Sequence, residues 1–119
     1  MHELSVALSL LDVISETLIR DADVHARATK VTVEVGALSG VVPDALRTAF
    51  TSAVAGGDLD GCAIELVPVA VALSCEPCGA EMPARAANDL RCAGCGTPSE
   101  LIVRGRELDV TAITWEPGS

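Results

Sequence analysis

The chain has 119 residues and a formal net charge of −9, and half of its residues are apolar although it has one Phe, one Trp and no Tyr. This length indicates one domain, or one domain with a small insert, whose core is built from Val, Leu, Ile and Ala. Because phosphate groups are bound by clusters of Lys and Arg, the acidic balance argues against a nucleic-acid-binding protein.

The first half of the chain predicts a helix, a strand and a second helix. From Leu4 to Arg20 apolar residues recur at helical spacing, as in an amphipathic helix; they are Leu4, Ala7, Leu11, Ile14 and Leu18. Valines alternate with polar residues from Lys30 to Gly36, which is the period of a half-buried strand. Pro43 suits the first turn of a helix that ends at Gly56-Gly57, with an apolar face of Leu46, Phe50 and Ala53.

The second half predicts strands on either side of a cysteine-rich segment. An apolar, β-branched strand runs from about Ala63 to Leu73, and Pro68 places it at a sheet edge or forces a bulge. From Glu100 the chain alternates again in two stretches separated by Arg104-Gly105-Arg106; the alternating residues are Leu101, Val103, Leu108, Val110 and Ala112. Residues 116–119 are typical of a frayed tail.

These elements predict an α/β (α+β) fold, a small mixed β-sheet with two helices and an inserted zinc-ribbon-like lobe. The expected α/β domain comprises residues 1–73 and 100–119. The lobe is expected over residues 74–99, inserted between two strands that could pair antiparallel and carry it.

The sequence indicates a cytoplasmic protein. An acidic residue stands near the N-terminus, in Met-His-Glu-Leu, where a signal peptide would carry basic residues. The longest apolar run, from Cys62 to Cys75, is too short to span a bilayer and contains Glu65 and Pro68. Cysteines arranged in metal-type pairs, without signs of secretion, favour a reducing compartment. No membrane partner is expected.

Two Cys-x-x-Cys pairs are the strongest motif. Cys75 and Cys78 form the first, Cys92 and Cys95 the second, and thirteen residues separate them. Four thiolates at this spacing predict one tetrahedral metal, favouring structural zinc, and such a closed site has no open position for chemistry. Gly79 and Gly96 follow the pairs, which predicts a positive φ and backbone amides turned toward the sulfurs.

Other interpretations of the cysteines are possible. A redox dithiol is typically one reactive cysteine pair at the N-terminus of a helix. This chain has two pairs, and each is followed by glycine. Arg85 and Arg91 lie between the pairs and either offset the negative charge of a zinc–thiolate site or are simply solvated. Cys62 is expected to be a small buried residue.

A second candidate site lies at the N-terminus. The Met1 amine, the His2 imidazole and the intervening amides lie within chelating reach, and such nitrogen donors suit square-planar Ni²⁺ or Cu²⁺. Glu3 would assist as an oxygen ligand or by its charge. A lone N-terminal histidine is more often solvated than ligating, and His25 is expected in an exposed loop. Catalytic constellations and phosphate loops are absent, so an enzyme is not expected.

Several segments together closely resemble the HypA/HybF family of hydrogenase maturation factors. They are residues 1–5 (Met-His-Glu-Leu-Ser), residues 33–46 (Val-Glu-Val-Gly-Ala-Leu-Ser-Gly-Val-Val-Pro-Asp-Ala-Leu), the two cysteine pairs, and residues 105–108 (Gly-Arg-Glu-Leu). The resemblance covers essentially the whole chain in order, and the combination is far more specific than the cysteine pairs alone.

The resemblance implies a nickel metallochaperone. It implies Ni²⁺ bound at Met1, His2 and Glu3, with His2 the essential ligand and the Met1 amine and local amides as companions. It implies structural zinc on the four paired cysteines, and an α/β fold with a small sheet, two helices and a zinc lobe. The implied partners are a nickel-handling GTPase of the HypB type and the large subunit of [NiFe]-hydrogenase.

The chain departs from the family pattern at one point, and one alternative function remains. Some relatives carry histidine beside the cysteine pairs, whereas this chain has Gly79 and Gly96, which argues against zinc-side pH sensing and against an auxiliary role in urease maturation. The alternative function is a zinc-ribbon protein-interaction module that does not bind nickel.

Overall fold

The computed structural model describes residues 3–21 and 26–116. Contacts divide the chain into two compact units, each described here by itself. The first unit comprises Met1–Val33, Val41–Val67 and Asp109–Ser119, and the second comprises Glu34–Gly40 and Pro68–Leu108. Residues 74–99, which the sequence predicts to form the lobe, all belong to the second unit.

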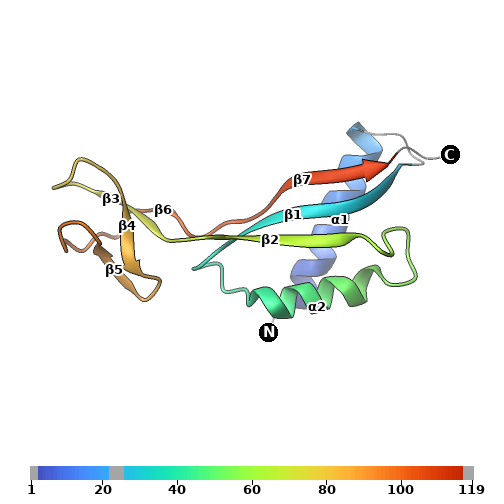
Figure 1. Ribbon diagram of the computed structural model, residues 1–119, viewed down its shortest axis with the longest axis horizontal. Coiled ribbons are helices and arrows are strands. Elements are labelled where there is room, and N and C mark those ends of the chain that lie inside the picture. The colour runs from blue at the N-terminus through green and yellow to red at the C-terminus, as the bar shows by residue number, and fades with distance from the viewer. Residues whose placement is uncertain (1–2, 22–25, 117–119) are drawn as a thin grey trace. The chain divides into compact units, whose positions relative to one another are not determined.

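Two helices and a three-stranded sheet account for the first unit and its connections (Figure 1). The helices are α1, Glu3–Asp21, and α2, Pro43–Val54. The strands are β1, Arg27–Gly36, β2, Ala63–Val69, and β7, Leu108–Glu116, in the order β2-β1-β7. Figure 1 shows β7 running opposite to β1 and β2, so the sheet is mixed, and Pro68 lies on an edge strand as expected.

A four-stranded sheet, of order β5-β4-β3-β6, forms the second unit. Its strands are β3, Ala72–Cys75, β4, Ala80–Ala86, β5, Asp89–Cys92, and β6, Ile102–Arg104. The expected strand from Ala63 to Leu73 is therefore two strands, β2 and β3, in different sheets. The expected antiparallel pair that carries the lobe is confirmed, because β3 pairs antiparallel with β6. The hairpin of β4 and β5 gives regular structure to the segment between the cysteine pairs, which sequence analysis left without strands.

The core of the first unit comes from both helices and β1. Its fully buried side chains include Phe50, Leu46 and Ile14 on the helices, and Val31 and Val33 on β1. The helices pack against each other. The mixed sheet and two helices confirm the predicted α+β fold, with aliphatic residues filling most of the core.

The predicted apolar stripe of α1 is partly wrong. Ala7, Ile14 and Leu18 are buried as expected, but Leu4 is 58% exposed, and Leu10 is buried in place of the half-buried Leu11. The predicted buried face is rotated around the helix axis relative to the observed one. Both sets of leucines repeat at helical spacing, so only packing decides which of them faces the core.

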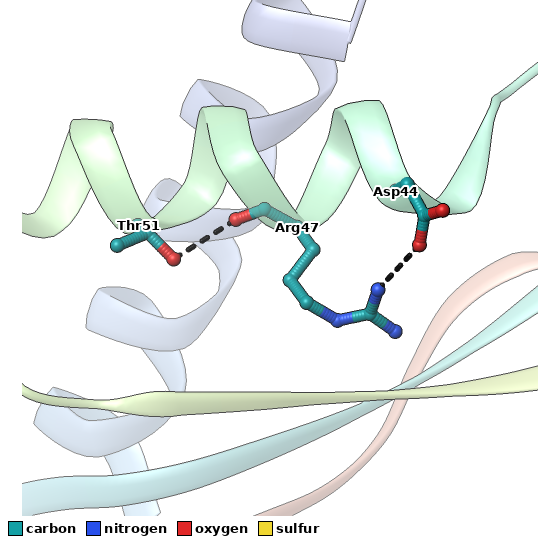
Figure 2. Close-up of polar contacts among 3 residues, drawn as sticks. All are labelled: Asp44, Arg47 and Thr51. Carbon is teal, nitrogen blue, oxygen red and sulfur yellow. Dashed lines mark hydrogen bonds and ion pairs between the residues drawn. The ribbon is translucent and has the colours of Figure 1, made fainter.

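Helix α2 begins as the sequence predicts. Pro43 stands at the first helical position, where its missing N–H is no loss, and Val42 provides no side-chain cap. Asp44 accepts a 2.7 Å hydrogen bond from Arg47, and the Thr51 hydroxyl donates to the Arg47 carbonyl oxygen at 3.0 Å (Figure 2). These contacts lie on the solvent side of the helix, while Leu46, Phe50 and Val54 form its buried face in place of the expected Ala53.

Three chain segments meet closely inside the second unit, at residues 36–38, 69–71 and 105–107, which we call the strand crossing. The Gly36 amide donates to the Glu107 carbonyl oxygen at 2.7 Å, and the Leu38 amide donates to the Gly105 carbonyl oxygen at 2.6 Å. The Ala37 amide donates to the Val69 carbonyl oxygen at 2.9 Å. A Cβ on Gly36 would lie 2.2 Å from the Gly105 carbonyl group, so the crossing admits only glycine there.

We expect Gly36→Ala to destabilise the protein by about 3 kcal/mol or more, because the added methyl group meets backbone that has no room to move. Gly57→Ala is the matched control, since its Cβ would meet nothing nearer than the Val54 carbonyl oxygen at 3.6 Å. Urea unfolding of both variants measures the difference. Equal stability of the two variants would contradict the close approach at the strand crossing.

Candidate metal centre

Each cysteine pair begins at the end of a strand and continues into a tight turn. Cys75 is the last residue of β3 and Cys92 the last residue of β5. Cys78 and Cys95 lie in the turns that follow. Cys75 and Cys92 are buried, whereas Cys78 and Cys95 are exposed, so the group of four sulfurs has one side in the lobe and one side at its surface.

The four sulfurs have the geometry of a metal cage. All four ligand atoms lie within 4.8 Å of one another. The Sγ atoms of Cys75 and Cys95 are 3.5 Å apart, and those of Cys78 and Cys92 are 3.9 Å apart. A tetrahedral zinc site with Zn–S bonds of about 2.3 Å has sulfurs separated by about 3.8 Å. The cysteines are free thiols, not disulfides, so the donor set fits zinc in both chemistry and size.

Glycines close both turns as predicted. Gly79 has φ of 65° and Gly96 has φ of 80°, and both values lie in the region that side-chain-bearing residues rarely adopt. Their amides, however, donate to carbonyl oxygens, Gly79 to Glu76 at 3.0 Å and Gly96 to Cys92 at 2.8 Å. The glycines therefore shape the turns, and other amides reach the sulfurs.

Backbone amides hold the sulfurs in place. The amide of Cys95, and then that of Gly94 at 3.3 Å from Sγ, donate to Cys92 and help to lower the pKa of its thiol. The ε-carbon of Met82 lies 2.7 Å from where a Cβ on Gly94 would stand. A side chain at this position would therefore displace Met82 from the turn that carries Cys92.

The four thiols differ in acidity. The Thr97 hydroxyl, which lies 3.2 Å from the sulfur, and the Thr97 amide lower the pKa of Cys95 to about 6. The sulfur of Cys75, followed by those of the other cysteines, raises the pKa of Cys78 to about 12. Because a bound metal requires thiolates, acid competes with metal for these four sulfurs.

The arginines of the lobe have different surroundings. Arg91 binds Asp89 through two hydrogen bonds of 2.7 and 2.8 Å, which lower the pKa of the Asp89 carboxyl. Arg104 pairs with Glu81 at 2.9 Å. Arg85 approaches the second cysteine turn, with its Nη2 atom 2.9 Å from the position of a Cβ on Gly96.

The remaining predicted residues are placed as follows. Glu3 is the first residue of α1 and is 9% exposed. Met1, His2 and His25 lie outside the described residues. Cys62 is buried, as expected, and lies directly between the turn that ends at Gly61 and the first residue of β2. Neither helix of residues 3–21 and 43–54 has the length and apolarity needed to cross a membrane.

The fold and the four-sulfur site define an α+β protein with a metal-binding lobe, and comparison with known proteins narrows this class. A family model described as "Hydrogenase/urease nickel incorporation, metallochaperone, hypA" matches residues 1–115. Hydrogenase maturation factor HypA of Streptomyces avermitilis is 36% identical over 118 residues, which cover 99% of this chain and 89% of that protein. Its counterpart in Roseiflexus sp. is 39% identical over 116 residues, covering 98% and 93%.

Solved structures have the same fold as this chain. The solution structure of the Ni metallochaperone HypA from Helicobacter pylori is similar with a TM-score of 0.68 and 23% identity, covering 98% of this chain and 99% of that one. The chain therefore belongs to the HypA family, whose members are metallochaperones for nickel incorporation into hydrogenase and urease. It is a maturation factor, not an enzyme.

Proposed function

We propose that this protein binds Ni²⁺ at Met1, His2 and Glu3 and delivers it for [NiFe]-hydrogenase maturation, while Cys75, Cys78, Cys92 and Cys95 hold one structural zinc ion. The main support for assigning zinc and nickel to different residues is the sulfur cage, because its four ligands already complete a tetrahedral metal site. Cargo that must be released needs different ligands, and the nitrogen donors at the N-terminus are the other candidate set in the sequence.

The start of α1 supports nickel binding at the N-terminus. Helical hydrogen bonds do not use the N–H groups of the first turn, so an amide ligand at Glu3 would cost the helix none of its own bonds. A cation at a helix N-terminus is opposed by the helix dipole, and the Glu3 carboxylate supplies the compensating charge. Glu3 and Asp44 also line a surface depression between the start of α1 and α2.

The partners that we propose are a nickel-handling GTPase of the HypB type and the hydrogenase large subunit, in the cytoplasm. Support comes from the relatives, which carry the name hydrogenase maturation factor. The site suits transfer because protons compete with the metal for an amine, an imidazole and amides, so a partner's ligands can displace them stepwise.

Lengthening the chain at its N-terminus tests the proposal. Two residues placed before Met1 convert the amine into an amide and move the free amine away, so we expect nickel binding to be lost while zinc remains. The same two residues added after Ser119 are the matched control. Calorimetric titration with Ni²⁺ gives the affinity. Unchanged affinity in the N-terminally extended protein would favour the alternative, a zinc-ribbon interaction module without a nickel site there.

A further inference from the structure

Arg85 occupies a distinctive position in the second unit. Its Nη2 atom lies 2.9 Å, and its Cζ atom 3.7 Å, from the point that a Cβ on Gly96 would occupy. Gly96 directly follows the exposed ligand Cys95. The guanidinium group therefore covers the backbone of the turn that carries one of the two surface sulfurs.

Two other arginines of this unit, Arg91 and Arg104, already form ion pairs with carboxylates. Arg91 is bound in two places by Asp89, and Arg104 is bound by Glu81. Within residues 3–21 and 26–116, Arg85 forms no ion pair with a carboxylate at 4.0 Å or less. The charge of Arg85 lowers the pKa of Asp89 only slightly, less than the hydrogen bonds and charge of Arg91 do. Its charge is available to a nearby anion.

The four-cysteine site provides such an anion, because Zn²⁺ with four thiolates carries two net negative charges. We propose that Arg85 is the counter-cation of the zinc–thiolate centre and slows the loss of its metal. A positive charge beside the centre offsets part of this negative charge and so stabilises the zinc-loaded state, and a competing ligand that removes the zinc must overcome that stabilisation.

This inference rests on the proposed zinc assignment, and the experiment separates the two. Metal analysis of the purified wild-type protein comes first: absence of zinc would contradict the zinc assignment itself. Zinc transfer to an excess of a chromophoric chelator is then followed at neutral pH and 0.1 M salt. Circular dichroism and thermal unfolding establish that each variant is folded before its zinc release is timed.

Three variants decide the role of Arg85. Arg85→Gln should release zinc about three- to fivefold faster than wild type, the size expected for one exposed charge. Arg85→Lys, which keeps the charge, should release it at nearly the wild-type rate. Arg106→Gln removes the same charge from an exposed position elsewhere in the same unit and should change nothing. The effect of Arg85→Gln should shrink in 1 M salt, where the Debye length falls from about 10 Å to about 3 Å.

Each outcome supports or overturns the proposal. Wild-type release from Arg85→Gln would overturn it, as would equal acceleration in Arg106→Gln. Equal acceleration in Arg85→Lys and Arg85→Gln would assign the effect to packing over Gly96 and not to charge. Zinc loss from Arg85→Gln during purification, with full retention in Arg85→Lys, would support the proposal in its strongest form.

Discussion

His2→Ala is expected to abolish nickel binding. Under the proposed function His2 supplies the imidazole ligand, and the remaining amine and amides do not complete a square-planar set. Changes in residues that only orient ligands cost about 10–100-fold in metal affinity, so loss of a ligand should cost at least about 100-fold. Isothermal titration of the untagged variant with Ni²⁺ measures this loss directly.

The other histidine gives the matched control. His25→Ala removes the same side chain from a position that we do not propose as a ligand, so its nickel affinity should equal that of the wild type. Both variants should keep one zinc per chain and unfold at the wild-type temperature. Equal nickel affinity of His2→Ala and wild type would refute the N-terminal site, and equal losses in both variants would point to a shared effect on folding.

Cys92→Ser is the second large expected effect. Cys92 is fully buried, ends β5 and accepts amide hydrogen bonds at its sulfur. A serine hydroxyl stays protonated near neutral pH and leaves zinc with three ligands. Because structural zinc sites contribute about 10–16 kcal/mol in small peptides, we expect zinc to be lost and the second unit to loosen. Elemental analysis and amide hydrogen exchange would follow the two effects.

The exchange pattern makes this prediction specific. Amides of β3, β4 and β5 should exchange faster, while those of α1 and α2 keep their protection. Cys62→Ala is the matched control, because Cys62 is a buried thiol outside the cage. It should retain full zinc and an unchanged second unit. Full zinc in Cys92→Ser would show that the four-cysteine assignment is wrong.

Local patterns predicted much of the fold. Val31 and Val33 alternate with polar residues, and this strand forms as β1, starting three residues earlier than expected at Arg27. Pro43 starts α2 as its missing N–H allows. The cysteine spacing anticipated a cage that the structure forms from two strand ends. Helix starts, strand alternation and turn glycines depend on residues a few positions apart, so the sequence alone predicts them. The cage joins residues twenty positions apart, and the sequence predicts it only because the spacing of the ligands is typical of a metal site.

Other features depend on distant contacts. Leu4 and Leu10 are equally apolar and both repeat at helical spacing, yet only Leu10 is buried, because packing against the rest of the unit sets the rotation of α1. Pro68 lies just before the break between β2 and β3, but Ala70 and Val71 in the break itself are apolar, so the sequence does not predict a change of sheet there. The chain changes sheets within the strand crossing, where the Val69 carbonyl accepts a hydrogen bond from the Ala37 amide and Val71 lies close to Gly105.

By itself, then, the sequence specified the candidate ligands, which are four sulfur donors at metal spacing and the nitrogen donors that we propose at the N-terminus. It also predicted most of the helices and strands. Ligand type and hydrophobic period belong to short stretches of chain, so they can be read without a fold. Only the tertiary structure decided which side of α1 is buried, that Gly36 must be glycine, and that Arg91 is engaged by Asp89 while Arg85 covers the second cysteine turn. Those outcomes depend on which distant atoms approach within a few ångströms, and no local pattern contains that information.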